Sequence, residues 1–288
     1  SLEFLWNHGL DIVPKPVTVD LALGCAIYQH VDGQDIPAAG ITEKDIDQSV
    51  RCLVRIKELC EAEGSAQLPI AAEACFSVQE IFQNIDGRLV RLQEAPADGE
   101  RYQDLHDFLD REFVPSFTEI RQWCQATFDA QGMSLEQELA HSERTLSPSD
   151  FGFHNAMKRP NGEIVFLDFE YFGWDDPAKM ISDFLLHPAM VLGEGLKQRF
   201  VDGMLSGFHE HDDLARRLAV VYPLFGLKWC TIILNEFLSE KLARREFANG
   251  VPADLVKMQA IQLEKARGLL NWVKETYSRF PHTSKSWS

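Results

Sequence analysis

The sequence lacks the features that mark several common classes of protein. Its six cysteines include no C-x-x-C pair and no zinc-finger spacing, so we expect reduced, mostly buried thiols rather than disulfides or structural zinc. We find no apolar run that reaches the roughly 18 residues of a membrane span. The N-terminus shows no basic and then apolar signal peptide, and no internal repeat or low-complexity segment is present. These absences favour a cytoplasmic protein without a membrane partner.

Positive charge is also scarce. The chain has 28 Lys and Arg residues against 44 Asp and Glu residues, a formal net charge of −16, and its basic residues are scattered. Nucleic-acid-binding proteins gather Lys and Arg into a patch that neutralises phosphates, so we expect no nucleic-acid partner. What the chain has in quantity is hydrophobic residues, 45% of 288, which suffice for one large domain or two unequal lobes.

Hydrophobic periodicity predicts a small β-containing start followed by a mostly helical chain. Residues 1–9 are typical of an amphipathic helix closed by Gly9, and residues 20–36 of short extended segments. Thr42 with Asp45 predicts the N-cap of the next helix. Further helical patterns cover residues 72–93, 101–130, 133–145 and most of the chain after 180.

One β-hairpin is predicted within the helical region. Asn161 and Gly162 stand between two short apolar runs, and Asn-Gly is a strong signal for a two-residue hairpin turn. With that turn as the loop, Asn155 and Asp168 lie opposite each other at the open end of the hairpin, about 5 Å apart between Cα atoms. Asp150 lies five residues before Asn155 in an irregular loop and can reach the same place.

This arrangement gathers two carboxylates and one amide around a small volume. Asp and Asn oxygens suit Mg²⁺, which keeps several waters and is usually shared with the phosphates of a substrate. The remaining Asp could orient a hydroxyl nucleophile and accept its proton. Asp and Asn are also common turn residues, so each of the three taken singly would be structural. Their conjunction is what favours a site.

The segment SDFGFHNAMKRPNGEIVFLDFEYFGWDDP, residues 149–177, resembles the catalytic and metal loops of the aminoglycoside phosphotransferase and choline kinase family. The resemblance implies that Asp150 is the catalytic base and that Asn155 and Asp168 hold Mg²⁺. It also implies an α+β, protein-kinase-like fold with a truncated β-containing N-lobe and a large, mostly helical C-lobe around a central catalytic hairpin.

The same resemblance implies a division of the chain and a mode of nucleotide binding. Residues 1–33 would be the remainder of the nucleotide-binding N-lobe and the hinge, and residues 34–288 the C-lobe with the acceptor site. AIYQHVDGQDI is similar to the hinge of the family, so the backbone of Gln29, His30 and Val31 is expected to contact the adenine of ATP.

The implied function is phosphorylation of a hydroxyl group on a small molecule, dependent on ATP and Mg²⁺. The acceptor would be similar to an aminoglycoside, choline or a sugar. A choline-type acceptor would need an aromatic cage. Aromatic residues available for one are Tyr171, Trp174 and Trp229.

Two departures from the family pattern matter. Pro148 and Ser149 stand where the family usually has His and Gly before the catalytic Asp. No Gly-rich phosphate loop and no strand lysine precede residue 1, and Glu3 stands in the place of the glutamate that pairs with that lysine. We expect that the sequence begins inside a longer protein, the other interpretation being a relative that lacks part of the lobe.

These departures leave a second functional hypothesis, a catalytically inactive, kinase-like module that binds or regulates. A third, a metal-dependent phosphohydrolase, would need a denser cluster of carboxylates and histidines. Other candidates have ordinary interpretations. FHEHDD, with His209 and His211, is typical of a turn at a helix start, and the Asp-Asp-Pro sequence at 175–177 predicts a helix cap. His154 and His187 could tune the site, although such histidines are more often simply hydrogen-bonded.

Overall fold

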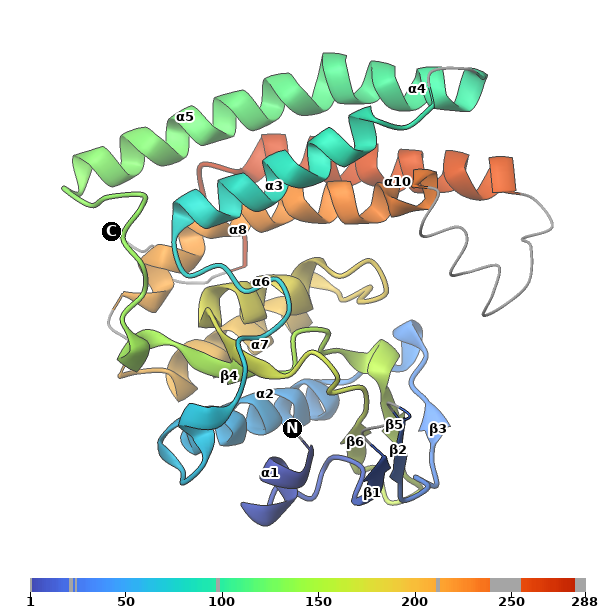
Figure 1. Ribbon diagram of the computed structural model, residues 1–288, viewed down its shortest axis with the longest axis vertical. Helices are drawn as coiled ribbons and strands as arrows, with labels where there is room; N and C mark the ends of the chain where they lie inside the picture. Colours follow the sequence, from blue (N-terminus) through green and yellow to red (C-terminus); the bar gives the residue numbers. More distant parts are fainter. Residues whose placement is uncertain are drawn as a thin grey trace. The chain divides into compact units, whose positions relative to one another are not determined.

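The computed structural model describes residues 2–20, 23, 25–96, 99–210, 213–238 and 255–282 (Figure 1). The chain divides into two compact units. Unit 1 comprises Ser1–Phe76, Leu139–Leu218 and His282–Ser288, and unit 2 comprises Ser77–Glu138 and Ala219–Pro281. Every residue predicted for the catalytic, metal and adenine sites belongs to unit 1, whereas Trp229, one of the aromatic residues suggested for an acceptor cage, belongs to unit 2.

Unit 1 contains helix α1 and three small antiparallel sheets. The helix, Leu2–Asn7, ends before Gly9, whose φ of 76° confirms the predicted stop. The first sheet pairs β1 (Pro16–Asp20) with β2 (Cys25–Tyr28). The second has the order β3 (Gln34–Asp35), β5 (Ala156–Lys158), β6 (Ile164–Phe166). The third pairs β4 (Thr145–Ser147) with β7 (Gly173–Asp175). The second sheet joins the N-terminal segment of unit 1, through β3, to the hairpin of β5 and β6.

Helix α2, Glu43–Glu58, begins where the sequence predicts. The side chain of Thr42 accepts a hydrogen bond from the backbone of Asp45, while the Asp45 carboxylate accepts one from the Thr42 backbone at 2.9 Å. Helix α7, Glu194–Gly207, packs against α2 through two glycines. A Cβ on Gly207 would overlap with Val54, so the glycine permits the close approach of the two helices.

The remaining helices of unit 1 follow the hairpin of β5 and β6. They are α6 (Pro177–Leu186), α7 and the first turn of α8 (Leu214–Ile233). Asp176 accepts a hydrogen bond from the backbone of Ala178 at 2.7 Å, and Pro177 occupies the first helical position. The predicted cap of α6 is therefore confirmed, because Pro has no N–H to leave unsatisfied there.

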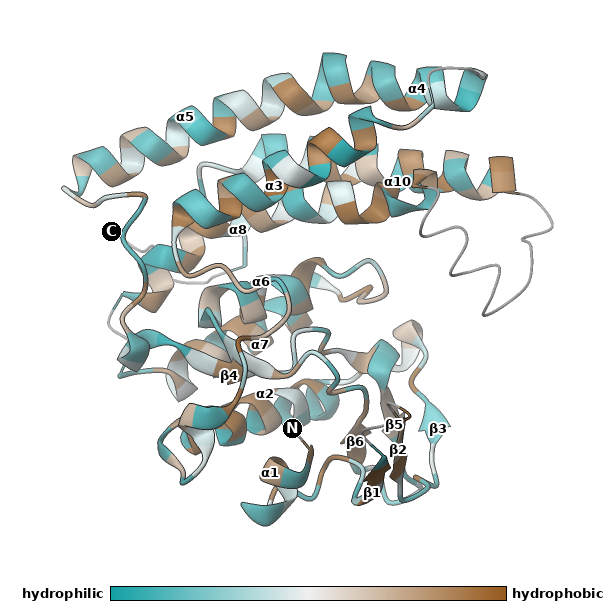
Figure 2. Ribbon diagram, viewed as in Figure 1, coloured by the Kyte–Doolittle hydropathy of each residue, from teal (hydrophilic) through white to brown (hydrophobic). Residues whose placement is uncertain are grey.

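Unit 2 is built from long amphipathic helices. Figure 2 shows hydrophilic and hydrophobic residues alternating along α3, α4, α5 and α10. Phe82, Phe108, Phe113 and Phe117 fill part of its core. Its elements are α3 (Val78–Gln93), α4 (Glu100–Phe108), a π-helical turn (Leu109–Phe113), α5 (Val114–Ala130), the rest of α8, η7 (Leu234–Phe237) and α10 (Leu255–Thr276). The predicted helices at 72–93 and 101–130 thus form, the first with a later start.

The sequence prediction was wrong in two places. Residues 133–145 do not form the predicted α-helix, because Gly132, with φ of 67°, ends α5; within them only the short 3-10 turn His141–Glu143 is helical, and part of the backbone bonds to other segments. Leu139, for example, donates to the carbonyl of Phe76 at 2.9 Å. The segment Leu214–Phe237 is also long and apolar enough to cross a membrane, contrary to our reading of the sequence. Since 78% of its apolar window is buried inside the protein, it has the character of a core helix.

All six cysteines are free thiols. Four of them are buried, Cys60 is partly buried and Cys25 is exposed. Burial raises the pKa of the Cys60 thiol above its usual range, which keeps it protonated at neutral pH. The expectation that the cysteines are mostly buried is confirmed.

Candidate functional site

Asp150 leaves β4 through a tight turn. Its backbone N–H donates to the carbonyl of Pro148 at 3.0 Å, and Ser149 between them has φ of 68°. This left-handed region favours Gly, the residue that the resembling family usually has at that position. Here Ser149 is held by local bonds instead, because its N–H donates to the Ser147 hydroxyl at 3.1 Å and its own hydroxyl to the carbonyl of Ala72 at 3.4 Å. The departure at Pro148 and Ser149 therefore preserves a turn that presents Asp150.

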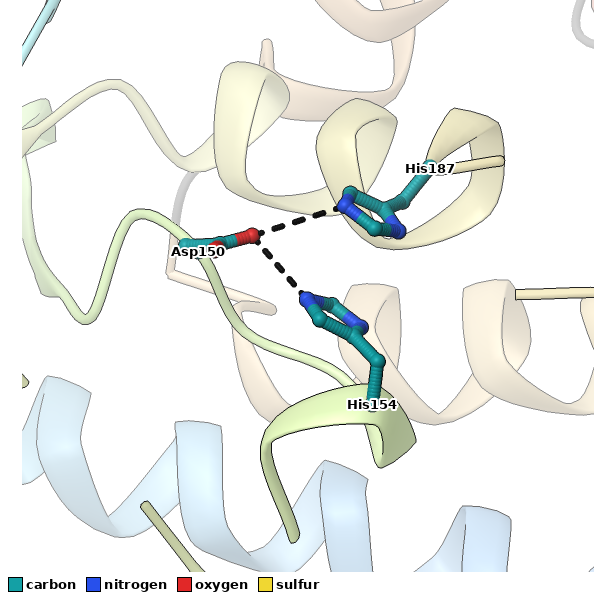
Figure 3. A group of neighbouring side chains, drawn as sticks. All are labelled: Asp150, His154 and His187. Atoms are coloured by element: carbon teal, nitrogen blue, oxygen red, sulfur yellow. Dashed lines mark hydrogen bonds and ion pairs between the residues drawn. The ribbon is translucent and has the colours of Figure 1, made fainter. Parts of the chain in front are cut away.

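The Asp150 carboxylate is contacted on both of its oxygens. Its Oδ1 lies 3.1 Å from Nε2 of His154 and 3.6 Å from Nε2 of His187 (Figure 3). Its Oδ2 accepts a hydrogen bond from the side-chain amide of Asn155 at 3.2 Å, and the same amide donates to the Asp150 carbonyl at 3.0 Å. Burial alone would raise the pKa of Asp150, but these donors hold it below its usual range. Asp150 is thus an oriented, ionised carboxylate at neutral pH.

The two histidines beside Asp150 lie in parallel planes. Their ring centroids are 3.9 Å apart and the planes differ by 3°. Their ligand atoms and that of Asp150 lie within 4.8 Å of one another, a spacing that a metal ion could use. Here the Nε2 atom of His154 is already engaged in a hydrogen bond with Asp150.

The hairpin that carries the predicted metal residues has a longer turn than predicted. Arg159 donates to the carbonyl of Glu163 at 2.8 Å, which leaves a three-residue loop at 160–162. Pro160 supplies the fixed φ of a type I turn, and Gly162, with φ of 84°, takes the left-handed position that follows it. The Asn-Gly signal therefore located the hairpin correctly but gave the wrong loop length.

One residue of loop length changes the register of the strands. Ala156 pairs with Phe166, and Leu167 donates to the carbonyl of Asn155 at 2.7 Å. The residue opposite Asn155 is thus Leu167, and the predicted pairing of Asn155 with Asp168 is wrong. Asp168 is the next residue and leaves the ladder with φ of 58°, which redirects the chain. Asp150 still acts electrostatically on Asp168, so the two carboxylates are neighbours.

Asp168 is a carboxylate with like charges around it. Partial desolvation and repulsion by Glu170 and Asp150 raise its pKa above the usual range. Among the residues that the structure describes, neither Asp168 nor Glu170 has an ion-pair partner. The amide nitrogen of Asn155 is engaged with Asp150, so the side-chain oxygen of Asn155 is the atom that could bind a metal ion. This all-oxygen set fits a hard divalent cation such as Mg²⁺.

The predicted hinge and the predicted metal loop line one pocket of about 560 Å³. Gln29, His30 and Val31 lie along it together with Asp168 and Glu170. Other residues of its wall are Leu2, Pro14, Tyr28, Met157, Leu167 and Phe169. The backbone N–H of Gln29 already donates to the carbonyl of Lys15 at 2.8 Å. Of the three hinge residues, His30 and Val31 are therefore better placed to offer backbone groups to a ligand.

Sequence reasoning missed a buried ion cluster on helix α6. The ammonium group of Lys179, 2% exposed, lies 2.7 Å from Asp175 and 3.1 Å from Asp183. Burial would lower the pKa of Lys179, but the two carboxylates raise it well above its usual range. Lys179 and Asp183 stand four residues apart on one face of α6, while Asp175 comes from the end of β7 just before the helix. The Lys-x-x-x-Asp spacing was the signal available.

Three other candidates have structural roles or fall outside the description. His209 Nδ1 contacts the carbonyl of Ser206 at 3.1 Å, while His211 and Asp212 of the same segment lie outside the described residues. Trp174 is buried and its indole N–H donates to the carbonyl of Ser65 at 3.0 Å. Trp174 is therefore not available for the aromatic cage that the sequence suggested, whereas Tyr171 is 47% exposed.

Comparison with solved structures identifies the fold. The choline/ethanolamine kinase family protein from Mesorhizobium loti is 16% identical, with a TM-score of 0.56 over 96% of this chain and 81% of that one. Choline kinase from Cryptosporidium parvum is 9% identical, with a TM-score of 0.57 over 95% and 77%. A spectinomycin phosphotransferase is 11% identical, with a TM-score of 0.57 over 93% and 80%. No protein-family model and no curated protein matches the sequence.

The chain thus has the α+β, protein-kinase-like fold shared by choline kinases and aminoglycoside phosphotransferases, as the sequence predicted. At these identities the likeness defines the fold alone. The roles assigned to Asp150, Asn155, Asp168 and the hinge, and the boundary between residues 33 and 34, stay predictions.

Proposed function

We propose that this protein is an ATP- and Mg²⁺-dependent phosphotransferase that phosphorylates a hydroxyl group of a small molecule. The observation that carries the proposal is the pocket in which the hinge meets Asp168 and Glu170, two carboxylates without an ion-pair partner in the described chain. Carboxylates without an ion-pair partner are typical of a site that binds an external cation. Nucleotides bind to proteins as complexes of their phosphates with such a cation.

The roles follow from the contacts of each residue. Asp168 and the side-chain oxygen of Asn155 would hold Mg²⁺, which when bound neutralises phosphate charge. The backbone of Gln29, His30 and Val31 would line the adenine site, with the free groups of His30 and Val31 making the contacts. Asp150, ionised and oriented, would accept the proton of the acceptor hydroxyl. Phosphoryl transfer depends mostly on positioning and charge neutralisation, so this short list suffices.

Structural neighbours support the same ligand classes. The spectinomycin phosphotransferase is in complex with ADP and spectinomycin, and an amicoumacin kinase of the same fold is in complex with AMP-PNP, Ca²⁺ and its antibiotic. We extend these classes to the present chain as a nucleotide, a divalent metal and a hydroxylated acceptor. The net charge of −16 favours a neutral or cationic acceptor and no nucleic-acid partner.

Calorimetric titration with ATP, with and without Mg²⁺, tests the proposal first. We expect binding that requires Mg²⁺ in the wild type and is lost in Asp168→Asn. A coupled assay for ADP release then screens choline, ethanolamine and spectinomycin as acceptors. Absence of ATP binding under both conditions would instead support an inactive, kinase-like binding module, for which the unusual Pro148-Ser149 sequence is the favouring observation.

A further inference from the structure

His187 lies on a rigid support beside the candidate catalytic base. It caps the C-terminus of α6, where its N–H donates to the carbonyl of Asp183 at 2.9 Å. Pro188 follows and cannot continue the helix. Almost every residue of α6 is buried, and the Lys179 ion cluster fixes the same helix from within. The backbone of His187 is therefore fixed at the end of α6, which fixes the point from which its imidazole extends.

The hydrogen bond at the far side of the ring sets its tautomer. The backbone N–H of Ala189 donates to Nδ1 of His187 at 3.2 Å. A nitrogen that accepts a hydrogen bond carries no proton, so in the neutral ring the proton resides on Nε2. That Nε2 is the atom 3.6 Å from Oδ1 of Asp150. Burial, with repulsion from His154, lowers the pKa of His187 to about 4, so the ring is neutral at pH 7.

His187 and His154 act on the same carboxylate oxygen from two elements of the fold. His154 comes from the catalytic loop and donates to Oδ1 at 3.1 Å, whereas His187 comes from α6 and stacks on the His154 ring (Figure 3). The stack also limits rotation of His154. A neutral donor orients the Asp150 carboxylate and lowers its basicity less than a nearby cation would.

We propose that His187 is a positioning residue for Asp150: through its Nε2–H and its stack on His154, it holds the carboxylate in the orientation that receives the acceptor proton. This inference rests on the proposed phosphotransferase function. The distance of 3.6 Å is a charge–dipole contact rather than a hydrogen bond, and catalytic contacts of this kind often shorten in the reactive complex. His187 itself does not touch substrate.

Two substitutions separate the N–H group from the ring. His187→Phe keeps a ring for stacking and removes the donor, whereas His187→Gln restores an N–H group at a similar reach. His209→Phe is the matched control, because His209 is an exposed histidine of unit 1 that contacts the carbonyl of Ser206. Circular dichroism and thermal melting confirm that each variant folds.

ADP release from MgATP, with an active acceptor or with water, is the kinetic measurement. We expect His187→Phe to lower kcat by about 10- to 100-fold, the scale of misplacing a catalytic group by about 1 Å. KM for ATP stays within about twofold, since the loss concerns the transition state and not nucleotide binding. His187→Gln recovers most of the lost kcat, and His209→Phe matches the wild type. Equal loss in the Phe and Gln variants, or a rise in KM alone, overturns the positioning role.

Nitrogen NMR of the wild-type protein tests the geometry without any activity. We expect the Nε2–H tautomer for His187, with signals that shift in Asp150→Asn. A proton on Nδ1, or signals indifferent to Asp150→Asn, also overturns the inference. A wild type that releases no ADP with any acceptor contradicts the proposed function instead, and the NMR result still decides whether His187 orients Asp150.

Discussion

Unit 1 contains two kinds of carboxylate, and they differ in what neutralises them. Asp175 and Asp183 share the buried Lys179, and Asp45 pairs with Lys158 at 2.6 Å. Asp168 has no such partner among the described residues, and its neighbours are further acids. Asp175, Asp183 and Asp45 are thus neutralised by lysines of the chain itself. Asp168 has no such lysine and can bind an external cation instead. Its uncompensated charge lowers the stability of the protein, and binding of a cation offsets this loss.

The largest expected effect separates chemistry from binding. Asp150→Asn removes the base but keeps the shape of the side chain and a partner for His154. We expect kcat for phosphoryl transfer to fall by about 100- to 10,000-fold, the usual contribution of general base catalysis. ATP affinity measured by calorimetry remains near that of the wild type. Asp47→Asn, which breaks a surface pair with Arg199, is the control for adding an amide.

The next largest effect is expected on stability, from a substitution in the buried ion cluster of Lys179. Lys179→Met removes the cation and leaves Asp175 and Asp183 buried without it, so we expect a loss of about 3–5 kcal/mol in the free energy of unfolding. Urea denaturation measures it. Lys57→Met, at an exposed pair with Glu210, is the matched control and costs about 1 kcal/mol or less. Equal losses in the two variants would remove the distinction between structural and surface pairs.

Asp168→Asn should move binding and stability in opposite directions. Loss of a direct metal ligand weakens MgATP binding by about 100-fold or more, beyond the cost of losing an outer-shell contact. In the absence of metal, the same substitution relieves repulsion with Glu170 and Asp150, so the melting temperature rises slightly. Calorimetry and thermal melting with and without Mg²⁺ check both. A lower melting temperature in metal-free buffer contradicts the view that Asp168 carries uncompensated charge.

Asp45 gives the smallest effect and a defined pH dependence. Burial raises its pKa, but bonds from Lys158 and Thr42 outweigh this and hold the pKa below 3.8. A depressed carboxylate pKa stabilises the fold above the pKa of the unfolded chain, about 3.9, and this contribution is lost as the pH falls through the folded value. Asp45→Asn should cost about 1–2 kcal/mol at pH 7. The difference from wild type, measured by urea denaturation, stays constant down to about pH 5 and shrinks below about pH 4.

The sequence predicted those parts of the site that depend on local signals. The Thr42 cap, the stop at Gly9 and the existence of the hairpin each rest on residues a few positions apart, and all three form. The predicted pairing of Asn155 with Asp168 is wrong because Pro160 and Gly162 form a turn with a three-residue loop instead of a two-residue loop. An Asn-Gly pair fits either a two-residue or a three-residue loop.

The features that the sequence did not predict depend on contacts between segments that are distant in the chain. The extended course of residues 133–145 depends on carbonyl partners such as Phe76, which lies more than fifty positions away in the chain. Trp174 looked available for a ligand, and only the structure reveals that Ser65 receives its N–H. The meeting of His187 with Asp150 likewise requires knowing where α6 ends.

The three-residue loop at 160–162 has a consequence for how this protein tolerates change. Loop tips usually accept insertions and deletions without harm. Here one residue more or fewer would slip the strands and turn Asp168 toward the opposite face of the hairpin. The side chains at 160 and 161 are exposed, but Pro160 fixes φ in the turn and the side-chain oxygen of Asn161 accepts a hydrogen bond from the backbone of Glu163 at 3.0 Å. Substitutions there weaken the turn, whereas a change in the number of residues alters the register. A deletion scan along this loop should therefore be far more damaging than a substitution scan, although neither touches the pocket.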